Sequence, residues 1–326
     1  MKQGKVPESV LTRSILKLIK QNREEVLEGP GIGEDCGILR SLGQDLCACN
    51  VAPVTGHIEE AGFRAVHAVV NNLAATGAAP LAVLPSILLP EDVKEKQLKR
   101  LIRDIQMVCD ELSISILGGH TESTSVISRP IITMTGIGTI AGKAYVTKGA
   151  KPDQDIVMTK YAAMEGTALI AREKESELET HYSRDFISQA KDMLYDISVL
   201  KDAETAVKFG ISSMHDARKG GIYGALWEFT SAAGIGMKVI LENIPVRQET
   251  VEICEFYDLN PYKLLSGGSL LITADKGYEL AEVFKAAGVP ACVIGKTTKE
   301  QKKIIIREGE EGFLEPPKSD EIYRIL

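Results

Sequence analysis

The sequence predicts an α+β (mixed α/β) protein built from two lobes. Segments with the apolar patterns of helices and strands alternate along the whole chain. Near the middle, residues 148–155 are polar and contain Gly and Pro, which is typical of a linker. Since the chain has 326 residues and domains usually run roughly 100–200 residues, we expect one lobe over residues 1–147 and a second over residues 148–326.

The hydrophobic pattern of the first lobe predicts three helices. Residues 8–20 carry one apolar face, and Pro7 suits the first turn. Residues 61–76 are rich in alanine, whose small side chains allow close packing against another surface. Residues 91–112 repeat apolar residues at spacings of three and four, the period of an amphipathic helix. Short apolar stretches at residues 36–39 and 46–51 and strands at residues 113–117 and 131–140 complete this lobe.

In the second lobe, strands and helices continue to alternate. The expected strands cover residues 156–159, 237–241, 270–273, 292–295 and 303–307. The expected helices cover residues 167–172, 184–195, 221–233, 248–256 and 278–286.

Composition and charge exclude several classes of function. The 38 Lys and Arg residues face 45 Asp and Glu, which leaves a net charge of −7 and argues against electrostatic binding of nucleic acid or an anionic membrane. The most apolar stretch, residues 78–90, is too short to cross a bilayer and contains three prolines. The start of the sequence lacks the apolar core of a signal peptide, and none of the six cysteines forms a CxxC pair. We therefore expect a cytoplasmic protein.

The cysteines show no familiar metal-binding pattern. We expect Cys47 and Cys49 to point to opposite faces of a strand, which argues against a metal clip between them. The histidines at 57, 67 and 181 have no ligand spacing, and we assign them no role.

Two common nucleotide-binding motifs are absent from the sequence. No GxxxxGK segment is present, and the glycines at 29, 31 and 33 have the wrong spacing for a dinucleotide site. However, Gly31 and Gly33 let the backbone approach a ligand, and the adjacent Glu34 and Asp35 can hold Mg²⁺ together with phosphate oxygens. The alternative is an exposed polar turn.

A second cluster of polar residues follows a short strand of the first lobe. Gly118 and Gly119 supply flexible backbone, and His120, Thr121 and Glu122 supply imidazole, hydroxyl and carboxylate groups. A phosphate and metal site at the edge of a sheet requires this combination. The alternative is a turn with a helix cap from Thr121. In the alanine-rich helix, two consecutive asparagines at 71 and 72 indicate either a specific hydrogen-bonding role or a polar face.

The second lobe also carries polar residues at strand ends. Lys160 follows the strand at residues 156–159. Residues 214–221 open a helix, where Arg218 and Lys219 favour an anion site. Asp216, in the same segment, could equally be an N-cap.

Taken in order, these segments resemble the aminoimidazole ribonucleotide (AIR) synthetase-like ATP-binding superfamily. The HypE-like, AIR synthase-related branch is the most similar. The resemblance covers nearly the whole chain, in residues 31–39, 61–80, 117–124, 149–160, 165–171, 214–228 and 264–273.

The resemblance implies a fold, cofactors and roles for residues. The amino-terminal sheet lobe would dimerise through its strands, the carboxyl-terminal lobe would combine sheet and helices, and ATP and Mg²⁺ would bind near the dimer interface. Asp35, Glu122 and Lys160 would be catalytic, and Asp35 and Glu34 would bind the metal. The residues implied in nucleotide binding are Gly31, Gly33, Asn71, Asn72, Gly118, Gly119, His120, Thr121, Asp216, Gly220 and Gly221.

The sequence departs from the family where the metal is expected. Ala52 and Asn72 stand where the family usually has acids, so two negative charges that would hold Mg²⁺ are missing. HypE ends in a cysteine tail, whereas this sequence has no cysteine after Cys292. We therefore expect ATP-dependent phosphoryl activation of a small substrate, with weak Mg²⁺ binding. The alternatives are a catalytically reduced nucleotide-binding or scaffold paralogue that acts through a protein partner, and a thiamine-monophosphate kinase-like enzyme, which ranks lower because it needs the missing acids.

Overall fold

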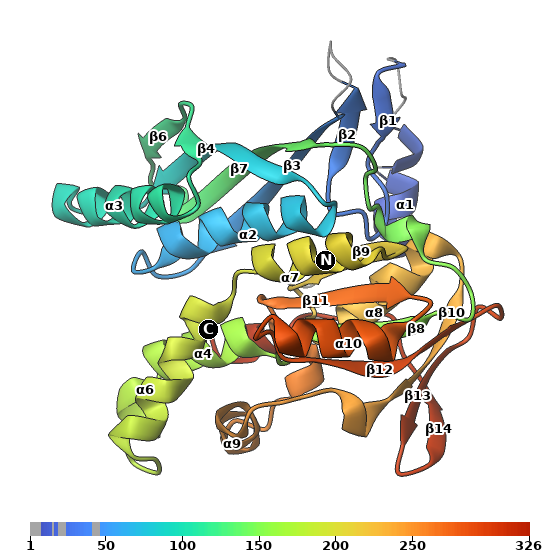
Figure 1. Cartoon of the computed structure of the whole chain (residues 1–326). Helices are drawn as coiled ribbons and strands as arrows, with labels where there is room; N and C mark the ends of the chain where they lie inside the picture. The colour runs from blue at the N-terminus through green and yellow to red at the C-terminus, as the bar shows by residue number, and fades with distance from the viewer. Residues whose placement is uncertain (1–7, 15, 19–23, 41–45) are drawn as a thin grey trace. The chain divides into compact units, whose positions relative to one another are not determined.

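The computed structural model in Figure 1 describes residues 8–14, 16–18, 24–40 and 46–326. The chain divides into two compact units. The amino-terminal unit holds residues 24–29 and 35–144, and the carboxyl-terminal unit holds residues 145–326. The described residues of 8–18 and the segment 30–34 also belong to the carboxyl-terminal unit. None of the described helices is long and apolar enough to cross a membrane.

The amino-terminal unit is one mixed sheet covered by two helices (Figure 1). Its strands follow the order β1-β2-β3-β7-β4-β5, and β6 also pairs with β4. The strands are β1 (Val26–Glu28), β2 (Gly37–Arg40), β3 (Leu46–Thr55), β4 (Ala79–Leu89), β5 (Ser115–Ile116), β6 (His120–Ser123) and β7 (Ile131–Ile140). The helices α2 (Ala61–Ala75) and α3 (Glu95–Glu111) lie on one face.

Helix α2 packs closely on the sheet because both surfaces carry small residues. All but one of its residues are buried, which confirms the close packing expected of an alanine-rich helix. A Cβ atom on Gly136 of β7 would lie 2.9 Å from the Cβ atom of Val69 on α2. Glycine at this position therefore lets the helix approach the strand.

The opposite face of this sheet is not covered by any described helix of the unit. Val51 on β3 and Leu81 on β4 are 61% and 49% exposed. Cys47 and Cys49 also lie on this side of β3, and their Sγ atoms are 3.7 Å apart. The expectation that they point to opposite faces was wrong, because residues two apart on a strand lie on the same face.

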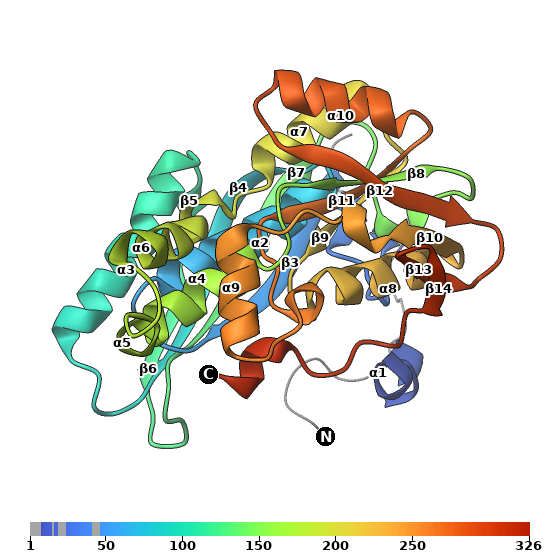
Figure 2. The ribbon, with the colours of Figure 1, turned by 90° about the horizontal axis from the view of Figure 1, so that it is seen from below.

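The carboxyl-terminal unit is built on a second sheet, with strand order β14-β13-β10-β12-β8-β11-β9. Its strands are β8 (Asp155–Thr159), β9 (Ser213–Ala217), β10 (Gly236–Ile240), β11 (Ser269–Ala274), β12 (Ala291–Thr298), β13 (Lys303–Arg307) and β14 (Glu310–Phe313). Its helices include α1 (Glu8–Ser14), α4 (Met164–Glu173), α5 (Glu175–Leu178), α6 (Arg184–Asp192), α7 (Leu200–Phe209), α8 (Gly221–Ala233), α9 (Gln248–Phe256) and α10 (Gly277–Ala286). Figure 2 shows α7 and α10 on one side of the sheet and α8 on the other.

Three neighbouring strands of this second sheet, one of them at its edge, are fully buried. Every residue of β8, β9 and β11 is buried, since helices cover both faces. A further cluster of apolar side chains joins α4, α6 and α9 and includes Ile322 near the end of the chain. The predicted site residues of this unit lie at the ends of these buried strands and in the adjoining turns, so the packed core holds them in place.

Several elements differ from the sequence expectation. Residues 78–90 contain three prolines and were assigned no element, yet they form β4, in which Pro80 lies at a register shift. The segment with Asp216 forms β9, so Asp216 is not an N-cap, and α8 begins only at Gly221. Of the helix expected at 8–20, α1 and a short 3₁₀ turn (Leu16–Leu18) are observed, and residues 7, 15, 19 and 20 lie outside the described residues. Helix α7 and strand β14 were not expected.

Candidate functional site

The predicted site residues are divided between the two units. In the amino-terminal unit lie Asp35, Asn71, Asn72, Gly118, Gly119, His120, Thr121 and Glu122. In the carboxyl-terminal unit lie Gly31, Gly33, Glu34, Lys160, Asp216, Gly220 and Gly221.

One polar cluster of the amino-terminal unit lies where β2, β3 and α2 meet. Cys36, just before β2, donates from Sγ to the backbone oxygen of Asn72 at 3.2 Å. Asn50 of β3 donates from Nδ2 to the backbone oxygen of Val69 at 3.0 Å. Burial raises the pKa of the Cys36 thiol, and the neighbouring Asp35 carboxylate adds to this rise. Asp35 therefore directly precedes a buried cysteine whose thiol contacts α2.

Ala52 lies on the helix-covered face of the same strand. It is 8% exposed, and the neighbouring inward positions Ala48 and Val54 are 0% and 1% exposed. An apolar side chain fits this buried site without any partner. The position where the family is expected to have an acid is therefore a core position in this chain.

The second polar cluster lies at the other edge of the amino-terminal sheet. Residues 117–123 are exposed, and His120 Nε2 lies 3.2 Å from Glu122 Oε2. Gly119 has a φ of +153°, and a Cβ atom there would lie 2.4 Å from the backbone oxygen of Pro85. Glycine is therefore required for β6 to run beside β4.

The amino-terminal unit does not bring these two clusters together. Between β2 and β6, the strands β3, β7 and β4 intervene. Four strand spacings of about 4.8 Å correspond to roughly 19 Å across the sheet. Asp35 and Glu122, both predicted to be catalytic, therefore lie far apart within one amino-terminal unit.

In the carboxyl-terminal unit, Glu34 binds the start of a 3₁₀ turn (Thr147–Gly149). Its two carboxylate oxygens accept hydrogen bonds from the backbone N–H groups of Thr147 and Lys148 at 3.2 and 3.1 Å. The preceding Gly33 has a φ of +71°, and a Cβ atom there would lie 2.6 Å from the backbone oxygen of Glu228. Gly33 is thus required by the backbone, and Glu34 caps a turn of its own unit.

Gly33 and Gly220 both line a cavity of about 510 Å³ in the carboxyl-terminal unit. This volume lies within the range of about 300–1,000 Å³ that small-molecule sites usually have. Trp227 of α8 forms part of the wall and donates from Nε1 to Glu8 Oε2 at 2.7 Å. The other residues of the wall are mainly apolar or charged: Ser9, Leu11, Ile32, Lys219, Glu228, Pro316, Pro317, Lys318, Asp320 and Tyr323.

Asp320 holds the amino-terminal end of α8. Its Oδ2 atom accepts a hydrogen bond from the backbone N–H of Gly220 at 2.6 Å, and its Oδ1 atom accepts from Leu265 at 3.1 Å and Ile322 at 2.9 Å. Asp320 is 5% exposed, and burial raises the pKa of its carboxyl against the opposing effect of these three N–H groups. The chain's own carboxylate thus occupies the N–H group of a predicted nucleotide-binding glycine.

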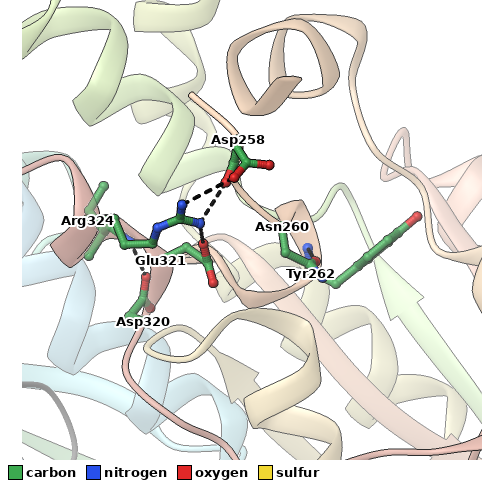
Figure 3. A network of polar contacts seen from close by, with 7 residues as sticks. Asp258, Asn260, Tyr262, Asp320, Glu321 and Arg324 are labelled. Atoms are coloured by element: carbon green, nitrogen blue, oxygen red, sulfur yellow. Dashed lines mark hydrogen bonds and ion pairs between the residues drawn. The ribbon is translucent and has the colours of Figure 1, made fainter. Parts of the chain in front are cut away.

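The segment after Asp320 is fixed by an ion-pair network (Figure 3). Arg324 donates from Nη1 to the backbone oxygen of Asp258 at 2.6 Å and to Glu321 Oε2 at 2.8 Å. The sequence analysis missed both Asp320 and Arg324. No local motif marks them, since Asp320 and Gly220 are 100 positions apart.

Lys160 has internal partners, and Asp216 is buried. Lys160, at a φ of +54°, places Nζ 3.2 Å from Asp202 Oδ2 and donates to the backbone oxygen of Ser198. Thr159 Oγ1 donates to the same Asp202 oxygen at 2.7 Å. Asp216 is 6% exposed within β9. The structure therefore places both residues in buried or nearly buried surroundings.

A buried ion pair lies beside these residues. Arg218 donates from Nε and Nη2 to the two carboxylate oxygens of Glu165, both at 3.0 Å. Glu165 itself is 0% exposed. In the described part of the chain, no group of three or more His, Cys, Asp or Glu side chains is arranged to hold a metal ion.

Known proteins similar to this chain form one family. Residues 33–140 match the amino-terminal domain of AIR synthase related proteins, and residues 151–308 match their carboxyl-terminal domain. A protein named for hydrogenase expression and formation from Methanocaldococcus jannaschii is 27% identical over 250 residues, which cover 75% of this chain and 72% of the relative. The carbamoyl dehydratase HypE of Cupriavidus necator is 27% identical over 213 residues, covering 64% and 58%.

Solved structures with the same fold agree with these matches. HypE in its complex with HypF superposes with a TM-score of 0.76 at 19% identity, covering 95% of this chain and 100% of the other. ThiL in complex with AMPPCP and TMP gives a TM-score of 0.75 at 18% identity and covers 98% of both chains. With two family domains that together span most of its length, the chain belongs to the AIR synthase-related family.

Proposed function

We propose that this protein binds ATP and uses it to activate a small substrate by phosphoryl transfer, in a maturation pathway like that of HypE. The main support is the family match over both domains, together with the fold shared with ThiL, which binds AMPPCP, an ATP analogue. The cavity of about 510 Å³ beside Gly33 and Gly220 has the size of a small-molecule site, and its wall includes Lys219 and Lys318 as well as Glu8, Glu228 and Asp320. In such chemistry the protein mainly positions the reacting groups and neutralises charge.

Magnesium would bind weakly in this proposal. Asp35 and Glu34 are the residues that would hold it, and when bound it would neutralise phosphate charge. The carboxylate oxygens of Glu34 already accept two backbone hydrogen bonds, although an ionised carboxylate can accept about four. Ala52 offers no side-chain ligand atom, and Asn72 offers a neutral amide instead of a carboxylate. The donor set therefore fits a weakened metal site.

We also propose that the protein is a homodimer and that it acts with a protein partner. Asp35 precedes β2 and Glu122 lies on β6, and three strands separate β2 from β6, so a second copy is the simplest way to bring such residues to one nucleotide. The complex of HypE with HypF supports a protein partner.

The second candidate function is nucleotide binding without turnover, as in a catalytically reduced paralogue. Two observations favour it. Ala52 is buried in the core instead of offering a carboxylate, and Asp320 occupies the N–H group of Gly220. A paralogue of this kind would bind ATP and act through its partner.

Calorimetric titration with ATP, with and without Mg²⁺, tests both candidates. We expect the native protein to bind ATP with a small Mg²⁺ dependence, and the double variant Ala52→Asp/Asn72→Asp to show a larger one. The matched control is Val51→Asp, which adds a carboxylate on the exposed side of the same strand and should leave the Mg²⁺ dependence unchanged. Absence of ATP binding in every form would exclude the nucleotide proposal. Binding by the native protein without hydrolysis in a substrate panel would favour the paralogue.

A further inference from the structure

Cys47 and Cys49 form a pair of thiols that the proposed function does not use. Their Sγ atoms are 3.7 Å apart on the side of β3 away from α2, and both side chains are half-buried and reduced. Cys47 also makes a weak contact from its Sγ to the backbone oxygen of Ala48 at 4.0 Å. The two sulfur atoms therefore lie close enough to contact one ion.

Strand geometry disfavours a disulfide between these thiols. Residues two apart on a strand have Cα atoms about 6.6 Å apart, close to the upper limit of about 6.8 Å for disulfide-bonded cysteines. Their Cα–Cβ bonds also run nearly parallel instead of converging. An ion held between the two sulfur atoms does not require them to come into covalent contact, so this geometry suits a bridging ion better.

The surroundings of the pair leave room for an ion with few ligands. The cross-strand neighbours of Cys49 are Gly37 on β2, which has no side chain to fill the space beside it, and Ile137 on β7, which carries no metal ligand. The neighbours of Cys47 are Leu39 on β2 and Thr139 on β7, neither of which carries a strong metal ligand. No third His, Cys, Asp or Glu joins the pair among the residues that the structure describes. Zinc, which usually takes four ligands in structural sites, is therefore disfavoured.

We propose that Cys47 and Cys49 form a two-thiolate site for a soft monovalent cation such as Cu⁺. Thiolates are the soft ligands that select Cu⁺ over hard cations. Binding releases two protons, because two neutral thiols and Cu⁺ give one bis-thiolate complex with a charge of −1. The site is independent of ATP and of the proposed function.

The protonation of the thiols makes the site dependent on pH. Thiolates, not neutral thiols, are the ligands, so the cation must displace a proton from each sulfur atom. Protons therefore compete with the cation over the whole neutral range, and affinity should rise with pH.

Anaerobic competition for Cu⁺ against a chromogenic chelator tests the site. We expect the native full-length protein to take up one Cu⁺ per chain, with two protons released per ion and tighter binding at pH 8 than at pH 6. Cys47→Ser and Cys49→Ser should each lose this uptake. The matched control is Cys292→Ser, which removes another half-buried thiol from the other unit and should keep it.

Three results would overturn the proposal. The first is Cu⁺ uptake that persists in Cys47→Ser or Cys49→Ser. The second is a stoichiometry of one Cu⁺ per two chains, since the two sulfur atoms of one chain would then be insufficient to bind the ion. The third is rapid air oxidation of the pair to an intramolecular disulfide, detected as a loss of two hydrogens by mass spectrometry, because the strand geometry would then favour the covalent bond. The serine variants are nearly isosteric with cysteine, and their circular dichroism spectra would show whether they fold.

Discussion

Restoring the missing acid at position 52 provides a quantitative test of why this chain lacks it. Ala52 is 8% exposed on the face of β3 that α2 covers. A carboxyl group buried in such surroundings can have its pKa raised by about three units, and each unit corresponds to about 1.4 kcal/mol. Because some exposure remains, we expect Ala52→Asp to lower the free energy of unfolding at pH 7 by about 3 kcal/mol.

Urea unfolding of the variant and of Val51→Asp would measure this effect. Val51 is 61% exposed, so its substitution should change the free energy by less than about 0.5 kcal/mol. For a unit of this size, the melting temperature shifts by about 4 °C per kcal/mol, so about 3 kcal/mol corresponds to a fall of about 12 °C. The introduced carboxyl would have a raised pKa in the folded protein, so its penalty should shrink as the pH falls and vanish only below the unfolded pKa of about 3.9, where the group is protonated in both states.

The effect of ligand on the stability of Ala52→Asp shows whether residue 52 is a core position or a metal-binding position. If the introduced carboxylate faces a metal site, Mg²⁺ with ATP should restore part of the lost stability, because a ligand that binds only the folded state stabilises it. Equal unfolding free energies for Ala52→Asp and Val51→Asp would refute the reasoning. Position 52 would then be open to water, and its burial could not explain the absent acid.

Two further predictions concern the buried carboxylates of the carboxyl-terminal unit. Burial raises the pKa of Asp320, so the folded state keeps the proton of this carboxyl up to a higher pH than the unfolded state does. The protonated carboxyl therefore makes its full contribution to the stability of the protein below the unfolded pKa. This contribution is lost as the pH rises through the folded pKa. The unfolding free energy of the native protein minus that of Asp320→Asn should therefore decrease between pH 4 and pH 7 in urea titrations, and an increase would contradict this. Arg218→Met should lower the free energy of unfolding by about 3–5 kcal/mol, because it leaves the Glu165 carboxylate buried without its bidentate partner. Adding Glu165→Gln should recover part of this loss in the same assay. If it does not, the buried charge of Glu165 is not the cause.

Most of the helices could be predicted because their periodicity is local. Helices α8 and α9 match their predicted bounds, and α2 and α3 differ by only a few residues. Strand β4 was missed because its prolines are unfavourable within a sheet, yet Pro80 lies at a register shift where the pairing is interrupted. The arrangement of Cys47 and Cys49 was wrong only because the two-residue period of a strand was misapplied.

The arrangement of the site was less predictable, because it depends on the order of strands. Adjacent residues such as Gly118 and Gly119 can be found from a motif, but no local signal shows that three strands separate β2 from β6. The partners of Lys160 and Gly220 come from positions 202 and 320. Such contacts are set by tertiary packing, and a single sequence contains no pattern that pairs them.

The bond between Gly220 and Asp320 also has a consequence for synthesis of the chain. A ribosome adds about 5–20 residues per second, so the backbone N–H of Gly220 is made about 5–20 seconds before the carboxylate that binds it 100 positions later. During that interval the start of α8 lacks its acceptor, and the cluster around Leu264 and Leu265 lacks Ile322. The carboxyl-terminal unit can therefore reach its final structure only after residue 322 has been synthesised, whereas the amino-terminal unit needs no residue beyond 144, so the carboxyl-terminal unit is the later of the two to mature.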